Sequence, residues 1–352
     1  MTVTPQSFKA AILVRTGSPL ELISGIEIPD LRQGQVLVKI AYAGLCHSQV
    51  MEARGHRGVD AYLPHMLGHE GTGHVVATGP KVEKIKVGDR VVLGWIKGEG
   101  HEARGTVYSS PIGNINAGGV TTFGEYAIVS ENRCVPLPDF IPMDIGVLLG
   151  CALPTGAGIV LNQLRPAEGI TAGVLGLGGI GLSALLALSI FKPKTLVAID
   201  CEQAKLDFAK ELGATHTCLA GDATEDEIKQ LTAGAGLDAC IEAAGHAATI
   251  ELGVKLVRRN GGRCIFASHP PAGDMIRLDP FDLISGKKIE GSWGGASHPD
   301  VDIPRIASLF TSNKLPLRRL LSHVYSLDNI NQSLDDLESR RIVRALIEIS
   351  PP

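Results

Sequence analysis

The middle of the chain carries the most regular hydrophobic pattern. A short apolar run at residues 171–175 is followed by the glycine-rich stretch GLGGIG at 176–181 and by an apolar helical stretch at 182–190. A second apolar run at 195–199 ends at Asp200. A strand, a glycine turn, a helix and a second strand in series predict a βαβ unit.

The same alternation continues toward the C-terminus. A helix is predicted at about 203–212, and Gly213 suits its C-cap. Residues 237–242 and 262–267 look like further strands, with helical stretches between them. Strands that alternate with helices predict an α/β fold with a doubly wound parallel sheet of the Rossmann type.

The first part of the chain has a different pattern. Val36, Val38 and Ile40 lie on one face of an alternating segment, which predicts a strand, and glycine-rich turns punctuate the region. A stretch rich in Pro and Gly at 153–158 ends it. We therefore expect a mainly β domain and a nucleotide-binding domain, made respectively of residues 1–152 with 295–352 and of residues 153–294.

One segment allows a different interpretation. Residues 169–191 contain no charged side chain and are long enough to span a bilayer. Five glycines fall within 173–181, and charged sequence continues on both sides. We therefore favour a buried strand and helix over a membrane span.

The composition is consistent with two folded domains. The chain has 352 residues, of which 44% are hydrophobic and 20% charged, and its formal net charge is -4. These values are typical of a globular protein and indicate neither a nucleic-acid nor an anionic-membrane partner. The N-terminal segment has no signal-peptide pattern, and the seven cysteines are an odd number. We therefore predict reduced thiols and a cytoplasmic location.

The glycine-rich stretch predicts a dinucleotide site, because it follows a strand and opens a helix. Gly176 would permit the tight turn, Gly178 would let the backbone approach a pyrophosphate, and Gly181 would let the helix pack closely on the strand. The start of the helix, with Gly179 and Ile180, offers free N–H groups and the positive end of the helix dipole to the phosphates.

Asp200 indicates which dinucleotide binds. It ends the second predicted strand, about 20 residues after Gly181, where a carboxylate can hydrogen-bond the ribose hydroxyls and would repel a 2′-phosphate. Lys205 is the nearest cation and a further candidate cofactor contact. A solvated carboxylate at a strand end is the alternative for Asp200, but the glycine motif beside it favours NAD over NADP.

Three short motifs carry candidate metal ligands. Cys46 lies in the motif GLCHS, His69 in GHEG and Cys151 in GC. Two cysteines and one histidine are a known ligand set for catalytic zinc, in which the fourth position stays open. A buried cysteine that acts as a small hydrophobe, or a structural histidine, is the alternative for each residue. The long spacing fits no zinc finger, so spacing alone leaves the question open.

Over nearly its whole length, the chain resembles the zinc-dependent medium-chain alcohol dehydrogenases. The resemblance implies a GroES-like catalytic domain beside the Rossmann domain. It also implies hydride transfer between NAD and a primary or secondary alcohol, a polyol or a sugar hydroxyl, which gives an aldehyde or ketone. The motifs that carry it are GLCHS at 44–48, GHEGTG at 68–73, VGDRVV at 87–92, TFGEYA at 122–127, GC and PTGAG at 150–158, GLGGIG at 176–181, IEGS at 289–292 and IVR at 342–344.

The resemblance implies roles for single residues. Cys46, His69 and Cys151 would bind one catalytic zinc per subunit, with Glu70 as an occasional ligand or a supporting carboxylate. Ser48 would contact the substrate oxygen and take part in proton transfer. The plain alternatives are a surface charge for Glu70 and a turn hydroxyl for Ser48. The other implied roles are cofactor contacts by His47, Thr155 and Arg344, and a substrate-pocket wall, or alternatively a core position, for Trp95.

The chain departs from the family pattern at several positions. Many relatives have four closely spaced cysteines that bind a structural zinc, whereas no cysteine lies between Cys46 and Cys134, so we predict that this zinc is absent. A polar insert at 97–119 takes its place, and its length suggests a function. Gln49 stands where many relatives have an aspartate that supports the zinc-bound histidine, and Met51 stands near the position of a relay histidine.

Two rival functions remain open. A zinc-free reductase of the same superfamily would act on activated double bonds, but that branch generally lacks the ligand set. A non-enzymatic NAD-binding relative is the second rival, which the change at Gln49 keeps in view. Arg54, His56 and Arg57 could meet a polar or phosphorylated substrate, although such side chains are more often surface charges. We expect a homodimer or homotetramer, and the sequence does not choose between them.

Overall fold

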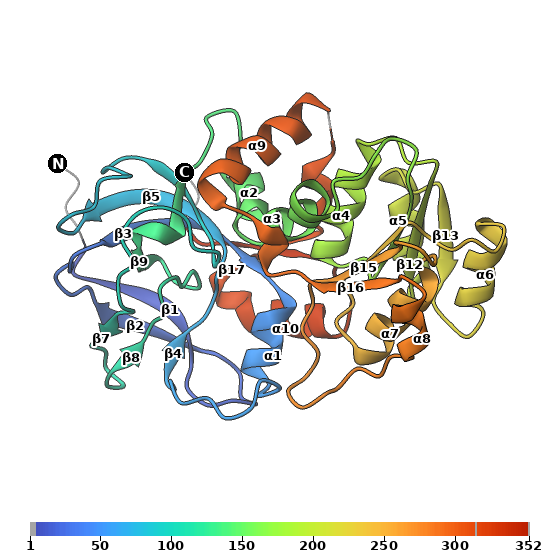
Figure 1. Ribbon diagram of the computed structural model, residues 1–352. Coiled ribbons are helices and arrows are strands. Elements are labelled where there is room, and N and C mark those ends of the chain that lie inside the picture. Colours follow the sequence, from blue (N-terminus) through green and yellow to red (C-terminus); the bar gives the residue numbers. More distant parts are fainter. Residues whose placement is uncertain (1–4, 314, 351–352) are drawn as a thin grey trace. The chain divides into compact units, whose positions relative to one another are not determined.

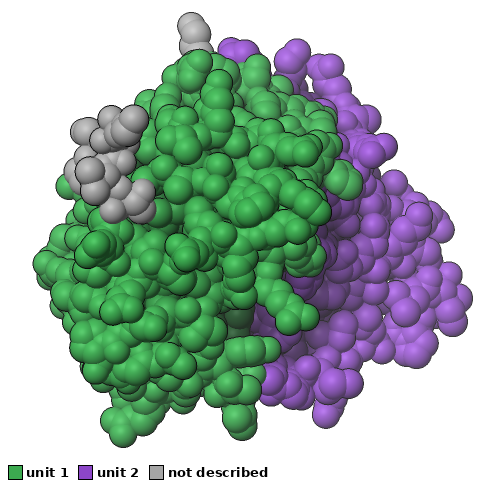
Figure 2. Space-filling model, turned by 90° about the vertical axis from the view of Figure 1, so that its left-hand side faces the viewer, with its two compact units in different colours: residues 1–151, 298–311, 317–352 green, residues 152–297, 312–316 purple. Residues whose placement is uncertain are grey.

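The computed structural model describes residues 5–313 and 315–350. The chain forms two units, which Figure 2 shows in different colours. The sequence predicted domain boundaries at 152/153 and 294/295. The catalytic role of one domain and the NAD-binding role of the other stay predictions. Unit 1 consists of Met1–Cys151, His298–Thr311 and Leu317–Pro352, and unit 2 of Ala152–Ser297 and Ser312–Pro316.

Unit 2 is built on six strands and the helices that connect them. The strands are β11 (Thr171–Leu175), β12 (Thr195–Asp200), β13 (His216–Leu219), β14 (Ala239–Glu242), β15 (Arg263–Phe266) and β16 (Lys288–Gly291). The helices are α3 (Ala152–Gly158), α4 (Gly179–Ser189), α5 (Gln203–Glu211), α6 (Thr224–Leu231), α7 (Ala247–Leu256) and α8 (Pro280–Ile284), with the π-helical turn η3 (Ile159–Leu164) and the 3-10 turn η4 (Gly294–Ala296).

The six strands form one parallel sheet in the order β13-β12-β11-β14-β15-β16. In chain order this is 3-2-1-4-5-6, the arrangement of doubly wound dinucleotide-binding sheets. Helix α4 lies on one face of the sheet and α7 on the other (Figure 1). Gly213 follows α5 with φ +110, which suits the predicted C-cap. The predicted α/β fold class is therefore confirmed.

The charge-free segment at 169–191 forms β11, the glycine turn and α4. Residues Leu182 to Leu188 are all buried, which means that protein surrounds α4 on every side. A helix in such surroundings is apolar on all its faces. Within the described residues, no single helix is long and apolar enough to cross a membrane. One bent helix pair, Met143–Gly150 with Ala152–Leu164, passes by length and composition alone.

Unit 1 is mainly β and contains two sheets. Its strands are β1 (Ser7–Leu13), β2 (Glu21–Glu27), β3 (Gln35–Leu45), β4 (His65–Met66), β5 (Gly71–Thr78), β6 (Arg90–Leu93), β7 (Val107–Tyr108), β8 (Ile115–Asn116), β9 (Tyr126–Ser130), β10 (Cys134–Pro136), β17 (His323–Ser326) and β18 (Ala345–Glu348). Its helices are α1 (His47–Ala53), α2 (Met143–Gly146), α9 (Pro299–Ser312) and α10 (Ile330–Glu338), with the 3-10 turns η1 (Glu131–Arg133), η2 (Val147–Gly150), η5 (Leu317–Leu320) and η6 (Leu327–Asn329).

The long strand β3 is the centre of the larger sheet, where it pairs with β5, β9 and β18. Val36, Val38 and Ile40 share one core, as their alternation predicts. Leu37 is also buried, in a second core on the opposite face. The strand is therefore covered on both faces along part of its length, and it ends at Leu45, immediately before the first candidate ligand.

The insert at 97–119 is not a loop throughout. Strands β7 and β8 pair as a hairpin and belong to the smaller sheet, which has the order β2-β1-β4-β8-β7. Tyr108 and Ile115 are fully buried, and the Tyr108 hydroxyl accepts a hydrogen bond from the N–H of Ile128 at 2.8 Å. The expectation of a polar insert is corrected here, because two of its side chains belong to the core of unit 1.

Candidate functional site

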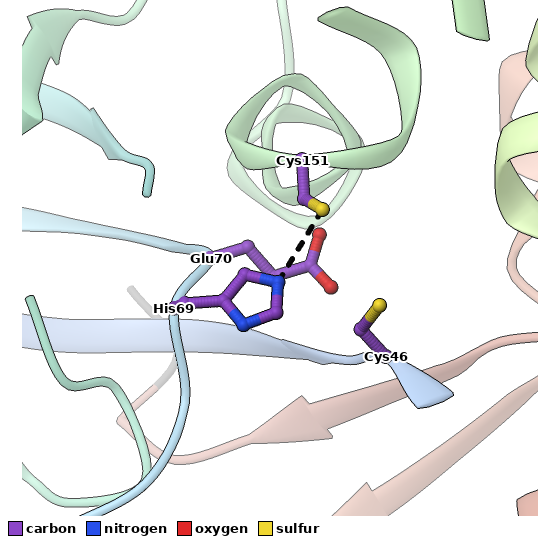
Figure 3. A group of neighbouring side chains, drawn as sticks. All are labelled: Cys46, His69, Glu70 and Cys151. Carbon is purple, nitrogen blue, oxygen red and sulfur yellow. Dashed lines mark hydrogen bonds between the residues drawn. The ribbon is translucent and has the colours of Figure 1, made fainter. Parts of the chain in front are cut away.

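Three segments of unit 1 bring the predicted zinc ligands together. Cys46 lies between β3 and α1, His69 and Glu70 immediately precede β5, and Cys151 follows η2. Their side chains point toward one another (Figure 3). One ligand atom from each of the four residues lies within 4.8 Å of the other three, and Nε2 of His69 is 3.3 Å from Sγ of Cys151.

Two glycines beside the ligands make room for Glu70. A Cβ at Gly44 would lie 2.6 Å from the Glu70 carboxyl carbon, and a Cβ at Gly150 would lie 2.9 Å from the Glu70 Cβ. Both distances are too short for any larger residue. Gly44, two residues before Cys46, therefore leaves room for the Glu70 carboxylate. Gly150, immediately before Cys151, leaves room for Cα and Cβ of Glu70 and for the Leu93 carbonyl oxygen, which a Cβ would meet at 2.4 Å.

Glu70 forms an ion pair with Arg344, which precedes β18. Nη2 of Arg344 donates to Oε2 of Glu70, and the side chains of Arg344 and Glu70 are 5% and 0% exposed. Burial alone would lower the pKa of Arg344, but Glu70 together with Cys46 and Cys151 outweighs it and raises that pKa. Burial raises the pKa of Glu70, and Arg344 opposes that shift. Among the described residues, Oε1 of Glu70 has no hydrogen-bond partner.

The two cysteines shift each other's pKa in opposite directions. A hydrogen bond from the Cys151 thiol lowers the pKa of Cys46 well below its usual value, against the effect of burial. The same hydrogen bond, together with burial, raises the pKa of Cys151. Burial would lower the pKa of His69, but its contact with Cys46 outweighs this and raises it. The lowered pKa favours the thiolate at Cys46, and the thiolate is the form of cysteine that ligates metals.

Gln49, in the first turn of α1, connects two of the ligands. Its Oε1 accepts a hydrogen bond from the backbone N–H of Cys46 at 2.9 Å, and its Nε2 contacts Nδ1 of His69. Oγ of Ser48 lies 3.5 Å from the same ring nitrogen. Sequence reasoning identified Gln49 as a departure from the family pattern but did not predict this bridge.

The donor set fits zinc. Zinc bonds of about 2.0 Å to nitrogen and 2.3 Å to sulfur place tetrahedral ligand atoms roughly 3.5 Å apart. The 3.3 Å between His69 and Cys151 agrees with that separation. Two thiols and one imidazole form the Cys₂His set of an open catalytic site, and the unpartnered Oε1 of Glu70 lies in the same cluster.

The glycine turn in unit 2 has the geometry that its motif predicts. Gly176 has φ +90, and a Cβ there would lie 2.4 Å from the backbone N of Ala244. A Cβ at Gly181 would lie 1.8 Å from the Gly176 carbonyl oxygen, so the helix packs directly on the turn. A Cβ at Gly178 would meet no atom within 4 Å, which leaves its backbone approachable. Gly179 and Ile180 open α4, and their N–H groups are the ones a phosphate would meet.

Asp200 connects the end of β12 to this turn. Its Oδ2 accepts from the N–H of Leu177 at 2.7 Å, and its Oδ1 accepts from the N–H of Glu202 at 3.1 Å. Nζ of Lys205 lies 2.8 Å from Oε1 of Glu202. Asp200 therefore stands beside the glycine turn, while its role toward a ribose and that of Lys205 stay predictions.

Glu242, at the end of β14, is a residue that sequence reasoning missed. It is fully buried, and its Oε1 accepts from the N–H groups of Ala244 and Gly245 at 2.9 and 2.8 Å. It thereby holds the turn against which Gly176 packs. An acidic residue that ends an apolar strand, three residues before Gly245, was the available signal.

The remaining predicted residues occupy varied positions. Thr155 is buried in α3, and its hydroxyl has no partner among the described residues. His47 is exposed and Trp95 is half-buried, and their roles stay predictions. Arg54 is held by Asp335 and Glu338 of α10, at 2.5 and 2.8 Å.

Comparisons with known proteins agree with this geometry. The family profile described as "Alcohol dehydrogenase GroES-like domain" matches residues 32–139, and the profile described as "Zinc-binding dehydrogenase" matches residues 179–311. The chain is 26% identical to an alcohol dehydrogenase class-3 from Cereibacter sphaeroides, with 96% of this chain and 99% of the relative covered. It is 28% identical to an S-(hydroxymethyl)glutathione dehydrogenase from Synechocystis, with 96% and 99% covered.

Solved structures give the same result. The benzyl alcohol dehydrogenase from Acinetobacter calcoaceticus superimposes with a TM-score of 0.88 at 28% identity, and 98% of this chain and 100% of that one are covered. An alcohol dehydrogenase zinc-binding domain protein from Burkholderia ambifaria also gives 0.88, at 29% identity, with 97% and 98% covered.

Proposed function

Because the chain belongs to the zinc-type medium-chain alcohol dehydrogenase family, we propose that it holds one catalytic zinc on Cys46, His69 and Cys151 and oxidises an alcohol with NAD. The observation that carries the proposal is the convergence of these ligand atoms within 4.8 Å, beside the buried Glu70. That set fits an open catalytic site, in which the fourth position is left for the substrate oxygen.

Zinc bound here would supply Lewis-acid chemistry that makes an alcohol hydroxyl more acidic. The chain's own residues do the rest. Ser48, whose hydroxyl lies 3.5 Å from Nδ1 of the ligand His69, would accept the substrate proton. The proton's onward route lacks a histidine at Met51, so water or the exposed His56 would carry it. Arg344 neutralises Glu70 and so limits the negative charge beside the ligands.

NAD would supply the hydride acceptor. In unit 2, the open backbone at Gly178 and the N–H groups that begin α4 are suited to a pyrophosphate. The carboxylate of Asp200 is suited to ribose hydroxyls and disfavours a 2′-phosphate. His47, Thr155, Lys205 and Arg344 remain proposed cofactor contacts, and Trp95 a proposed pocket wall.

The substrate is proposed to be an uncharged alcohol, polyol or sugar. Arg54 is neutralised by two carboxylates, and the nearest oxygen of Glu52 lies 3.8 Å from Arg57. Both pairings weaken the case for a phosphorylated substrate. We also propose that no structural zinc is bound, because the insert contributes Tyr108 and Ile115 to a packed core. A cytoplasmic homodimer or homotetramer completes the proposal.

The test is to follow NADH absorbance while purified protein receives NAD and a panel of alcohols. The panel includes simple alcohols, benzyl alcohol, polyols, sugars and S-(hydroxymethyl)glutathione. Turnover that disappears on removal of zinc supports the proposal. Turnover of an activated double bond without zinc would favour the zinc-free reductase, and NAD binding with no turnover across the panel would favour a non-enzymatic protein.

A further inference from the structure

We propose that Gln49 holds His69 in the tautomer whose Nε2 carries the proton, and thereby lowers the affinity of the ligand cluster for zinc. The inference rests on the proposed function, since it concerns how tightly the proposed zinc site binds its metal. It implies that the metal-free protein is stabilised by its own hydrogen-bonded arrangement, which zinc must displace.

The first step is the orientation of the Gln49 amide. The backbone N–H of Cys46 can only donate a hydrogen bond, and it lies 2.9 Å from one end of the amide. That end must therefore be the oxygen Oε1. The NH₂ group consequently faces Nδ1 of His69, which is the contact that the structure shows.

The second step is the position of the His69 proton. An amide NH₂ group can only donate, so Nδ1 of His69 must accept. In a neutral imidazole, the proton then lies on Nε2. Nε2 is the nitrogen that faces the cluster, 3.3 Å from Sγ of Cys151, so its proton is directed at a sulfur acceptor. In the metal-free protein, each donor in these three contacts therefore faces an acceptor: the Cys46 N–H faces Oε1 of Gln49, the Gln49 NH₂ faces Nδ1 of His69, and the His69 Nε2–H faces Sγ of Cys151.

The third step is the cost for a metal. Zinc needs the lone pair of Nε2, so the proton must lie on Nδ1, where it opposes the NH₂ group of Gln49. If the Gln49 amide turns over, its oxygen can accept from Nδ1 of His69. Its NH₂ group then faces the backbone N–H of Cys46, so that two donors oppose each other there. Ser48 could accept instead, but 3.5 Å is long for a hydrogen bond. Gln49 is 2% exposed, which leaves little space for water to intervene.

The first test compares zinc affinity in three variants by competition with a chromogenic chelator. Gln49→Glu offers only acceptors to Cys46 and His69, so binding should tighten by roughly 10- to 100-fold. Gln49→Met removes the opposing donor without adding charge, so its zinc affinity should exceed that of the wild type. Met51→Glu adds the same charge on α1 without replacing the amide, and should change affinity by less than about threefold on the same scale.

The outcomes separate the inference from its alternatives. Zinc binding by Gln49→Met that is equal to or weaker than that of the wild type would mean that Gln49 does not oppose the metal, and would overturn the inference. An unchanged affinity in Gln49→Glu would do the same, as would an equal gain in Met51→Glu. Circular dichroism and melting temperature establish that each variant is folded. If the wild type and His69→Ala bind zinc equally, the proposed zinc site itself is wrong. That result overturns the proposed function and is distinguishable from failure of the Gln49 inference alone.

A second measurement reads the tautomer directly. Protein labelled with ¹⁵N at histidine is prepared without metal, and the ring nitrogens of His69 are assigned by comparison with His69→Asn. We expect the chemical shifts of a neutral ring protonated at Nε2 in the wild type, and of a ring protonated at Nδ1 in Gln49→Glu. A wild-type ring protonated at Nδ1 would overturn the proposal whatever the zinc affinities are.

Discussion

The guanidinium of Arg344 and the carboxylate of Glu70 form a buried ion pair between residues 274 positions apart in the chain. Glu70 follows the ligand His69, and Arg344 precedes β18, which pairs with the end of β3. The pair therefore connects the C-terminal part of unit 1 to the strand and loop that carry Cys46 and His69. A carboxylate at this depth needs such a partner, because an unpaired buried charge is costly.

Removal of Arg344 should be strongly destabilising. Arg344→Met leaves the Glu70 carboxylate buried without its partner, and we expect a loss of about 3–5 kcal/mol in the free energy of unfolding. The double variant Glu70→Gln/Arg344→Met removes both charges and should recover a large part of that loss. Urea denaturation of the two single variants and the double variant measures the coupling. Strictly additive effects would show that the ion pair is not a unit.

Substitution of two glycines in the same motif should have different effects, one on stability and the other on NAD binding. Gly181→Ala places a Cβ 1.8 Å from the Gly176 carbonyl oxygen. We therefore expect the free energy of unfolding to fall by about 1–3 kcal/mol. Gly178→Ala meets no atom within 4 Å, so its melting temperature should stay near that of the wild type. Its NAD affinity should fall by roughly tenfold, which is about 1.4 kcal/mol. Calorimetry and NAD titration separate the effects, and equal melting temperatures for the two variants would contradict this account.

Asp200 should control the choice of dinucleotide. Asp200→Asn keeps an oxygen for the N–H of Leu177 and removes the charge. We expect the preference for NAD over NADP, measured as the ratio of kcat/KM values, to fall by roughly 10- to 100-fold. Asp207→Ala, on the exposed side of α5, is the matched control and should leave the ratio unchanged. An unaltered preference in Asp200→Asn would place the ribose contact elsewhere.

Glu131 anchors the start of the insert. Its carboxylate is 1% exposed and accepts hydrogen bonds from the N–H groups of Glu83, Lys84 and His101, each at 2.7 Å. Burial would raise the pKa of Glu131, but these backbone donors outweigh it and hold the pKa below its usual range. The carboxylate therefore stabilises the fold at neutral pH. That contribution is lost as pH falls from about 4.3, the unfolded value, through the folded pKa.

Glu131→Gln should remove this pH-dependent stability. The amide offers one acceptor where the carboxylate offers two, so we expect a loss of about 2–3 kcal/mol at pH 7. The difference from the wild type should shrink as pH falls from about 4.3 toward the lower folded pKa of Glu131, because the wild-type side chain becomes neutral as well. Urea denaturation across that range tests it, with the exposed Glu83→Gln as control. A difference that stays constant with pH would rule out the carboxylate as its source.

The sequence predicted those features that depend on neighbours in the chain. The apolar run, GLGGIG and the helix after it form β11, the turn and α4, because period and glycine spacing act locally. His69 and Cys151 are 82 residues apart, and only the ordered motifs of a family connected them. The bridge from Gln49 to His69 and the burial of Tyr108 depend on which segments meet in space. No local pattern contains that information.

The most direct test of the account is the amount of zinc bound at equilibrium. Equilibrium dialysis followed by elemental analysis is applied to the wild type, to Cys46→Ser and to Cys201→Ser, whose cysteine is exposed and far along the chain from the ligands. We predict one zinc per chain in the wild type and in Cys201→Ser, and none in Cys46→Ser. Zinc retained by Cys46→Ser, or two zinc ions in the wild type, would contradict a single site on Cys46, His69 and Cys151.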